Sequence, residues 1–120
     1  MNDTLDAYDK CIDICKQCAR VCESCTASCL EEADPTQFAD CVRCTIDCAS
    51  MCNLAAKFLS RESEFLQLIC EDCAEICSKC AEKCRAHEAE HCQQCADICI
   101  ACAKECLKVG TAAIDMAELV

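Results

Sequence analysis

The chain has 120 residues and a formal net charge of −11, and it contains 20 cysteines, 3 phenylalanines, 1 tyrosine and no tryptophan. Its length suits a single domain spanning residues 1–120. The acidic balance argues against a nucleic-acid partner, because phosphate binding requires a basic face. No apolar run approaches the length of a membrane span, so no membrane partner is expected either.

The cysteine content has two ordinary explanations, and the sequence argues against both. A secreted disulfide scaffold needs an export signal and many loops. Residues 1–6 are acidic without an apolar run, and the chain has 1 glycine and 1 proline. Cysteine can also serve as a small apolar core residue, but that would account for a few positions and not for 20 at regular spacing.

The cysteines form four clusters in which successive cysteines are three or four residues apart. This is the spacing of the buried face of a helix in a bundle. In the second cluster the steps run 3, 4, 4, which predicts that Cys52 lies one place off the strict seam. In chain order the clusters are Cys11, Cys15, Cys18, Cys22, Cys25 and Cys29; Cys41, Cys44, Cys48 and Cys52; Cys70, Cys73, Cys77, Cys80 and Cys84; and Cys92, Cys95, Cys99, Cys102 and Cys106.

Few signals interrupt the helical pattern between these clusters. Asp34 and Pro35 predict an N-cap followed by a first-turn proline, and residues 60–63 predict a turn with a capping serine. The rhythm of the third cluster jumps before the fourth, which predicts a turn at 86–90, and Gly110 suits a C-terminal cap. The expected helices are 4–32, 35–59, 62–86 and 89–109.

Short connections make neighbouring helices antiparallel. The predicted fold class is therefore all-α, an antiparallel up-down-up-down four-helix bundle with a cysteine-lined core. Apolar residues gather at the end that holds both termini and should seal it. They are Leu5, Tyr8, Leu54, Phe58, Leu59, Phe65, Leu66, Ile69, Leu107 and Val109.

The cysteine spacing favours a soft metal ion with low coordination. Side chains three or four residues apart on a helix lie about 5–6 Å from one another, and two bonds of about 2.3 Å can join such a pair through one ion. Cu(I) prefers thiolates and neutralises them one for one, whereas zinc in separate four-thiolate sites would leave about −2 at each. Iron–sulfur clusters usually take cysteines from loops. These arguments rank multiple Cu(I) ions first, without excluding the other metals.

The opposite end of the predicted bundle carries two histidines beside cysteines. His87 follows Cys84, and His91 precedes Cys92. We interpret His87 and His91 as weaker transit ligands at an open end through which Cu(I) enters and leaves. Residues 87–91 also match the H-E-x-x-H pattern of zinc proteases, but that pattern needs one continuous helix, and here it falls on a predicted turn.

The run from Cys70 to Cys84, the turn with His87, His91 and Cys92, and the opening run Cys11 to Cys29 resemble the cytosolic four-helix-bundle copper storage proteins of bacteria. The resemblance covers nearly the whole chain. It implies Cu(I) storage in the cytoplasm by a homotetramer that is not an enzyme, with copper chaperones or cuproenzymes as donors and acceptors. Cys44 departs from the family's pattern.

Three alternatives stay open on the sequence. The protein could be a metallothionein-like zinc or cadmium detoxification protein, an iron–sulfur electron carrier, or a structural bundle whose thiols buffer redox changes. All three share the cysteine-rich core. The first two differ in the metal that they would hold, and the third uses the thiols without a metal.

Overall fold

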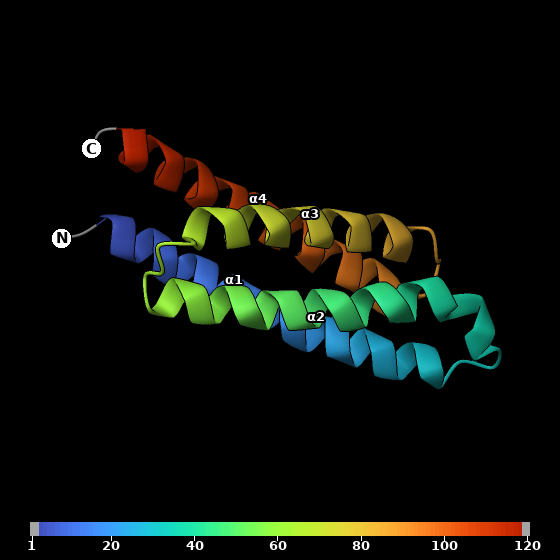
Figure 1. Ribbon diagram of the computed structural model, residues 1–120. Coiled ribbons are helices and arrows are strands. Elements are labelled where there is room, and N and C mark those ends of the chain that lie inside the picture. Colours follow the sequence, from blue (N-terminus) through green and yellow to red (C-terminus); the bar gives the residue numbers. More distant parts are fainter. Residues whose placement is uncertain (1–2, 119–120) are drawn as a thin grey trace.

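Four long helices form the molecule. The computed structural model describes the backbone of residues 3–118 and the side chains of residues 4–112. The helices are α1 (Asp3–Leu30), α2 (Ala39–Ser60), α3 (Leu66–Arg85) and α4 (Glu90–Glu118), and a short 3₁₀ helix, η1 (Pro35–Phe38), precedes α2 (Figure 1). Within the described residues there is no strand. The predicted all-α class is confirmed.

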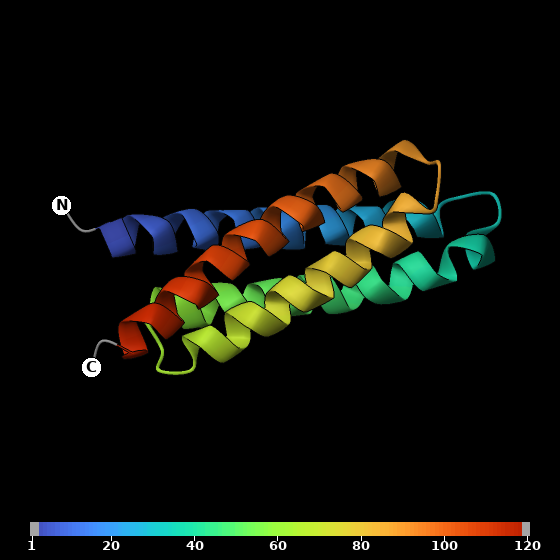
Figure 2. The ribbon, with the colours of Figure 1, turned by 90° about the horizontal axis from the view of Figure 1, so that it is seen from above.

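The helices run up, down, up and down, and each packs against two others, in the order α1, α2, α3, α4 and back to α1 (Figure 2). The two termini and the α2–α3 connection lie together at what we call the terminal end. The α1–α2 and α3–α4 connections lie together at what we call the histidine end (Figure 1). Among the described helices none is both long and apolar enough to cross a membrane.

The core-facing positions of every helix are three or four residues apart. On α2, however, the sequence prediction chose the wrong residues for some of these positions. Cys41, Cys48 and Cys52 are fully buried, and so is Thr45. The seam of α2 therefore steps from Cys41 to Thr45 and on to Cys48 and Cys52, with steps of 4, 3 and 4. Cys44, not Cys52, lies off the seam, because a threonine occupies the core position next to it.

The second and third helices each begin four residues later than predicted. After Asp34, Pro35 begins η1, and α2 starts only at Ala39. The third helix begins at Leu66 rather than at 62, with the hydroxyl of Ser63 accepting a hydrogen bond from the Phe65 N–H at 3.0 Å. The end of α2 is fixed by a bond from the Ser63 N–H to the Phe58 carbonyl, with Glu62 at φ 48°, a conformation that usually belongs to glycine.

The prediction that Gly110 ends the fourth helix is wrong. Gly110 has a helical conformation within α4, which continues to Glu118. It is buried against α3, where an added Cβ would meet Cys70 Cβ at 3.7 Å. Glycine interrupts a helix only weakly when the residues after it favour helix, as the alanines of 112–113 do.

The terminal end is sealed by fewer residues than expected. Leu59, Leu66 and Val109 are buried, and Tyr8, Phe58 and Ile69 pack against them. The remaining four predicted members are exposed: Leu5, Leu54, Phe65 and Leu107. A compact apolar layer therefore closes the cysteine core at this end, and the exposed residues lie outside it.

Candidate metal centre

The cysteine sulfurs form a continuous column along the bundle axis. Every cysteine except Cys44 is buried, and all 20 are free thiols. Sulfurs from different helices lie 3.6–3.9 Å apart at most crossings, such as Cys48 to Cys77 at 3.6 Å and Cys18 to Cys99 at 3.8 Å. The 3/4 spacing turns each cysteine inward, and the antiparallel packing places it opposite cysteines of the neighbouring helices.

The column can be divided into overlapping groups of four thiols, and the sulfurs within each group lie within 4.8 Å of one another. Neighbouring groups share members: Cys18 and Cys48 each belong to two, and so do Cys22 and Cys99. Five of the groups are Cys15, Cys73, Cys102 and Cys106; Cys18, Cys48, Cys52 and Cys77; Cys18, Cys22, Cys48 and Cys99; Cys22, Cys80, Cys95 and Cys99; and Cys25, Cys29, Cys41 and Cys92. Sharing means that bound ions would be bridged by common sulfurs.

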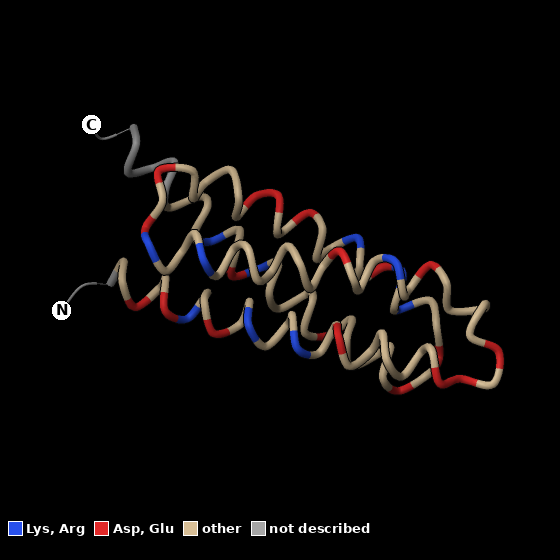
Figure 3. The backbone as a smooth tube through the Cα atoms, turned by 60° about the horizontal axis from the view of Figure 1, so that its bottom comes forward, with Lys and Arg blue, Asp and Glu red and all other residues tan. Residues whose placement is uncertain are grey.

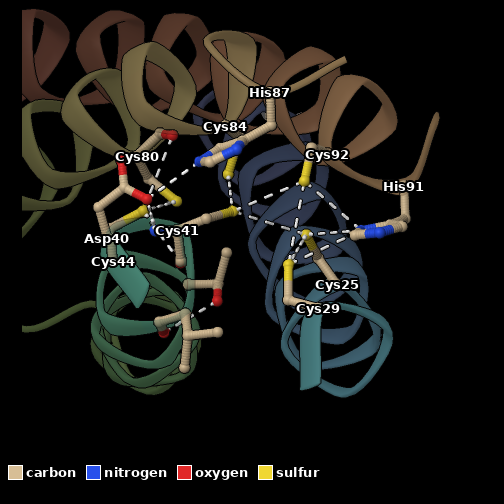
Figure 4. A network of polar contacts seen from close by, with 12 residues as sticks. Cys25, Cys29, Asp40, Cys41, Cys44, Cys80, Cys84, His87, His91 and Cys92 are labelled. Atoms are coloured by element: carbon tan, nitrogen blue, oxygen red, sulfur yellow. Dashed lines mark hydrogen bonds and ion pairs between the residues drawn. The ribbon is translucent and has the colours of Figure 1, made fainter. Parts of the chain in front are cut away.

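At the histidine end the column finishes in the group Cys25, Cys29, Cys41 and Cys92, with His91 beside it (Figure 4). The His91 Nδ1 lies 3.5 Å from the sulfur of Cys92, 3.6 Å from that of Cys25 and 3.8 Å from that of Cys29. Its Nε2 lies 3.3 Å from a carboxylate oxygen of Glu32. This places one imidazole nitrogen on the thiols and the other on an acidic surface residue.

Protonation differs among the thiols of this group. Burial raises the pKa of Cys29, and burial raises the pKa of Cys92 to about 11. Hydrogen bonding from Cys41 lowers the pKa of Cys25 to about 6. For His91, burial works to lower the pKa, but hydrogen bonds to Cys25 and Glu32 outweigh it and raise the pKa. Thiolates are the form that binds metal, so each thiol of this group must lose its proton when an ion binds.

The two histidines, predicted to act alike, have different surroundings. The His87 Nε2 lies 3.0 Å from a carboxylate oxygen of Asp40, which takes that nitrogen away from the sulfurs. The ring of His87 stacks on Phe38, with centroids 4.8 Å apart, and the His91 ring lies 6.0 Å from the same phenyl group. The structure brings His91 to the thiols and leaves His87 in the surface layer above them.

The histidine end is covered rather than open, contrary to the sequence prediction. Cys84 and the four thiols of the last group are at most 2% exposed, beneath the rings of Phe38, His87 and His91. Sequence reasoning missed Phe38. Its signal was an isolated aromatic residue just after Pro35, since the 3₁₀ turn that proline begins carries the phenyl ring over the column's end.

Carboxylates surround the histidine end. In Figure 3 acidic residues gather at the α1–α2 connection and along the adjoining helix ends. Residues 85–89 contain one lysine or arginine, Arg85, and its guanidinium nitrogen lies 2.6 Å from a carboxylate oxygen of Asp97. Such a surface attracts cations. The acidic residues are Glu31, Glu32, Asp34, Asp40, Glu88 and Glu90.

The H-E-x-x-H match does not form a zinc protease site. His87 lies in the connection between α3, which ends at Arg85, and α4, which begins at Glu90. The two histidines therefore do not lie on one continuous helix, as that motif requires. The predicted turn at 86–90 is confirmed.

The sequence model of the family described as "Copper storage protein" matches residues 4–111 of the chain. The chain belongs to the copper storage protein family. The matched region holds all four cysteine clusters and both histidines. The family identity agrees with the resemblance that the cysteine pattern indicated.

Members of the family with solved structures share the fold at full length. A "Cu(I)-bound Copper Storage Protein BsCsp3" is 36% identical, with a TM-score of 0.83 over 87% of this chain and 98% of that one. A cytosolic copper storage protein from Streptomyces lividans, with five coppers, is 30% identical, with a TM-score of 0.89 over 92% of this chain and 98% of that one. An uncharacterised cysteine-rich protein of Bacillus subtilis is 39% identical over 69% of this chain and 77% of its own length.

Proposed function

We propose that the protein stores Cu(I), holding many ions on the thiolates of its core, and that it is not an enzyme. The observation that carries the proposal is the sharing of sulfurs between neighbouring four-thiol groups. Bridged ions need about one Cu(I) per thiolate, which leaves the buried core neutral. The Cu(I)-bound and copper-loaded relatives support the choice of metal.

The proposed ligands are the 20 cysteines, with His91 as a transit ligand and His87 in a weaker role. The position of His91 Nδ1 within 3.8 Å of three sulfurs supports loading from the histidine end. The carboxylates there would concentrate cations near the rings of Phe38, His87 and His91. At the other end, the buried side chains of Leu59, Leu66 and Val109 lie next to the column.

Zinc is the second candidate, because the distances between sulfurs favour it in one respect. A tetrahedral zinc with bonds of about 2.3 Å holds its sulfurs about 3.8 Å apart, and several sulfurs already have that separation. However, groups that share two sulfurs cannot be filled independently. Zinc would occupy only some of them and leave each occupied site with about −2 of buried charge.

An anaerobic Cu(I) titration of the reduced protein against a strong Cu(I) chelator, with elemental analysis, tests the proposal. We expect saturation at about 10–20 ions per chain, the lower value for two unshared thiolates per ion and the upper one for full bridging. Saturation at a few ions would contradict storage. Zinc that competes with Cu(I) at equal concentration would support detoxification, and visible sulfur-to-iron absorption in the purified protein would support an electron carrier.

We further propose that the chain acts in the cytoplasm, as the Streptomyces lividans relative is described, and that it forms a homotetramer. Apolar side chains that are more than a third exposed on the outer faces, among them Ile46, Leu68 and Ile100, support association. Copper chaperones or cuproenzymes would donate and accept its ions. Light scattering of the apo and loaded protein measures the oligomer, and a monomer in both states would contradict the tetramer.

A further inference from the structure

Cys44 is the one cysteine whose place the bundle does not explain. Thr45 takes the core position at this level of α2, with its hydroxyl 2.6 Å from that of Thr26 and donating to the Val42 carbonyl. Cys44 is therefore not needed to fill the core. It is half-buried, whereas the other 19 of the 20 cysteines are buried.

The sulfur of Cys44 lies at the floor of a side pocket between α2 and α3. The pocket has a volume of about 290 Å³ and is lined by Cys44, Asp47, Ile76, Lys79 and Cys80. The Cys44 sulfur lies 3.3 Å from that of Cys80 (Figure 4). Two thiols thus meet at a surface hollow on the flank of the bundle, about one helical turn along α2 from Cys41 and Asp40.

The pair is joined to the interior of the column. Cys80 also belongs to the group with Cys22, Cys95 and Cys99, whose sulfurs lie within 4.8 Å of one another. An ion held by Cys44 and Cys80 can therefore pass inward by exchanging one sulfur at a time. This route meets the column in its middle, without passing His91 or the group that contains Cys25.

We propose that Cys44 and Cys80 form a lateral exchange site at which a low-molecular-weight thiol delivers or removes single Cu(I) ions. The inference rests on the proposed storage of Cu(I) and adds a second route to it. A linear ion with bonds of about 2.3 Å needs its two sulfurs about 4.6 Å apart. Because Cys44 is half-buried, its side chain can turn outward from the present 3.3 Å to reach that separation.

The exchange is a ligand substitution in which copper remains Cu(I). The Cys44 thiol loses its proton, and its sulfur bonds to the Cu(I) of an incoming copper–thiol complex. The bond between copper and the small thiol then breaks, and the departing thiolate takes up a proton. Cys80 replaces the remaining outside ligand in the same way, so one Cu(I) enters for two protons released from the protein.

Pocket size and charge favour a small thiol over a protein partner. Cys80 is fully buried behind a pocket of about 290 Å³, which admits a small molecule more readily than a folded protein's loop. Lys79 and Asp47 line the pocket, and Lys79 Nζ also lies 3.5 Å from Glu75, so a lysine offsets part of the acidic charge here, whereas carboxylates predominate at the histidine end. Small cellular thiols that carry carboxylates are repelled less on this flank than at the histidine end.

The test uses the full-length protein, loaded with Cu(I) under anaerobic conditions. Transfer to the bulky anionic chelator bicinchoninate is followed by absorbance, with and without reduced glutathione as the small thiol. We expect glutathione to accelerate transfer from the wild type. Cys44→Ser should reduce the glutathione-dependent rate about tenfold, because a hydroxyl is a much poorer Cu(I) ligand than a thiolate. Both rates are expressed per bound Cu(I), because Cys44→Ser also removes one of the proposed ligands.

A second variant keeps both thiols and blocks the pocket. Ile76→Trp should also reduce the glutathione-dependent rate, while Ile46→Trp, an equally bulky change at an exposed position of α2, should not. Far-UV circular dichroism verifies that each variant is folded. No acceleration of the wild type by glutathione, or an unchanged glutathione-dependent rate in Cys44→Ser, would overturn the lateral site. A wild type that binds only a few ions would instead overturn the storage function.

Discussion

The two histidines show how much depends on the direction of a single side chain. His91 presents Nδ1 to three sulfurs, while His87 binds Asp40 through Nε2 and stacks on Phe38. Sequence spacing placed both beside cysteines and treated them as equivalent. The Nδ1 of His91 can receive copper, whereas the Nε2 of His87 is already bound to Asp40. This difference arises from how Phe38 of η1 and the two histidine rings pack together.

Replacement of each histidine should therefore have unequal effects on copper uptake. His91→Asn should slow the anaerobic uptake of Cu(I) by about tenfold, the lower end of the range for removing a group that supports a metal site. His87→Asn, the matched control, should slow it less, because the Nε2 of His87 is bound to Asp40. Stopped-flow measurement of Cu(I) transfer from a weak chelator gives both rates. Equal rates in the two variants would contradict the distinct roles.

The protonation of His91 should depend on Glu32. In the apo protein its pKa is raised above 6.5, the ordinary value, with Glu32 as one cause. A raised folded-state pKa stabilises the fold below the unfolded value of about 6.5, and this contribution is lost as the pH rises through the folded value. Glu32→Gln should lower the pKa of His91, measured by NMR titration. Glu31→Gln removes the same charge from an adjacent exposed position and should change it less; equal shifts would point to general surface charge instead.

At the scale of the helix, the structure departs from the sequence prediction where a residue's usual preference is overruled by its neighbours. Gly110 continues α4 instead of ending it, and Glu62 adopts a conformation that glycine usually holds at the end of α2. Neither residue violates a backbone limit. Gly110 lies against Cys70 and Glu71 of α3, and Glu62 lies in the turn closed by the bond from the Ser63 N–H to the Phe58 carbonyl.

Gly110 consequently offers a stabilising substitution. An added Cβ would lie 3.7 Å from both Cys70 Cβ and Glu71 Cγ, which is ordinary contact. Gly110→Ala should therefore raise the free energy of unfolding by about 0.5–1 kcal/mol, the cost of glycine in a helix interior. Denaturant unfolding of the reduced apo protein measures this free energy. Thr111→Ala, at the next and exposed position, is the control and should have a smaller effect. A less stable Gly110→Ala variant would show that α3 and α4 need the closer approach at this point.

The 3/4 rhythm predicted the helices, their order and the inward position of most cysteines, because a bundle helix must bury one face and the cysteines mark it. On α2 it placed Cys44 on the seam and Cys52 off it, the reverse of what the structure has. It could not show that Thr45 continues the seam of α2. A polar residue beside a cysteine is the less obvious candidate for the core, and the hydroxyl of Thr26 that accommodates it lies on another helix. The same limit hid Phe38, whose role depends on where the α1–α2 connection meets the α3–α4 connection.

At the scale of the whole molecule, the buried column of described cysteines contains no polar group that needs a metal ion to satisfy it. The described side chains leave no buried nitrogen or oxygen without a hydrogen-bond partner, and neutral thiols cost little to bury. We therefore expect the apo protein to be folded, with copper adding stability by mass action. Far-UV circular dichroism before and after removal of copper by a chelator and reductant tests this. Loss of the helical signal on removal would mean that copper organises the site.

A preformed neutral column also fixes how many protons leave as copper enters. Thiols must be deprotonated to bind, so each Cu(I) held by two unshared sulfurs releases about two protons, and each Cu(I) in a fully bridged column releases about one. Because neighbouring groups share Cys18, Cys48, Cys22 and Cys99, we expect the ratio to fall from about two toward about one as loading proceeds. Anaerobic titration in a weakly buffered solution with a pH indicator measures the ratio at each addition. A ratio that stays at about two until saturation would mean separate two-thiolate sites, with half the capacity and no bridging along the axis.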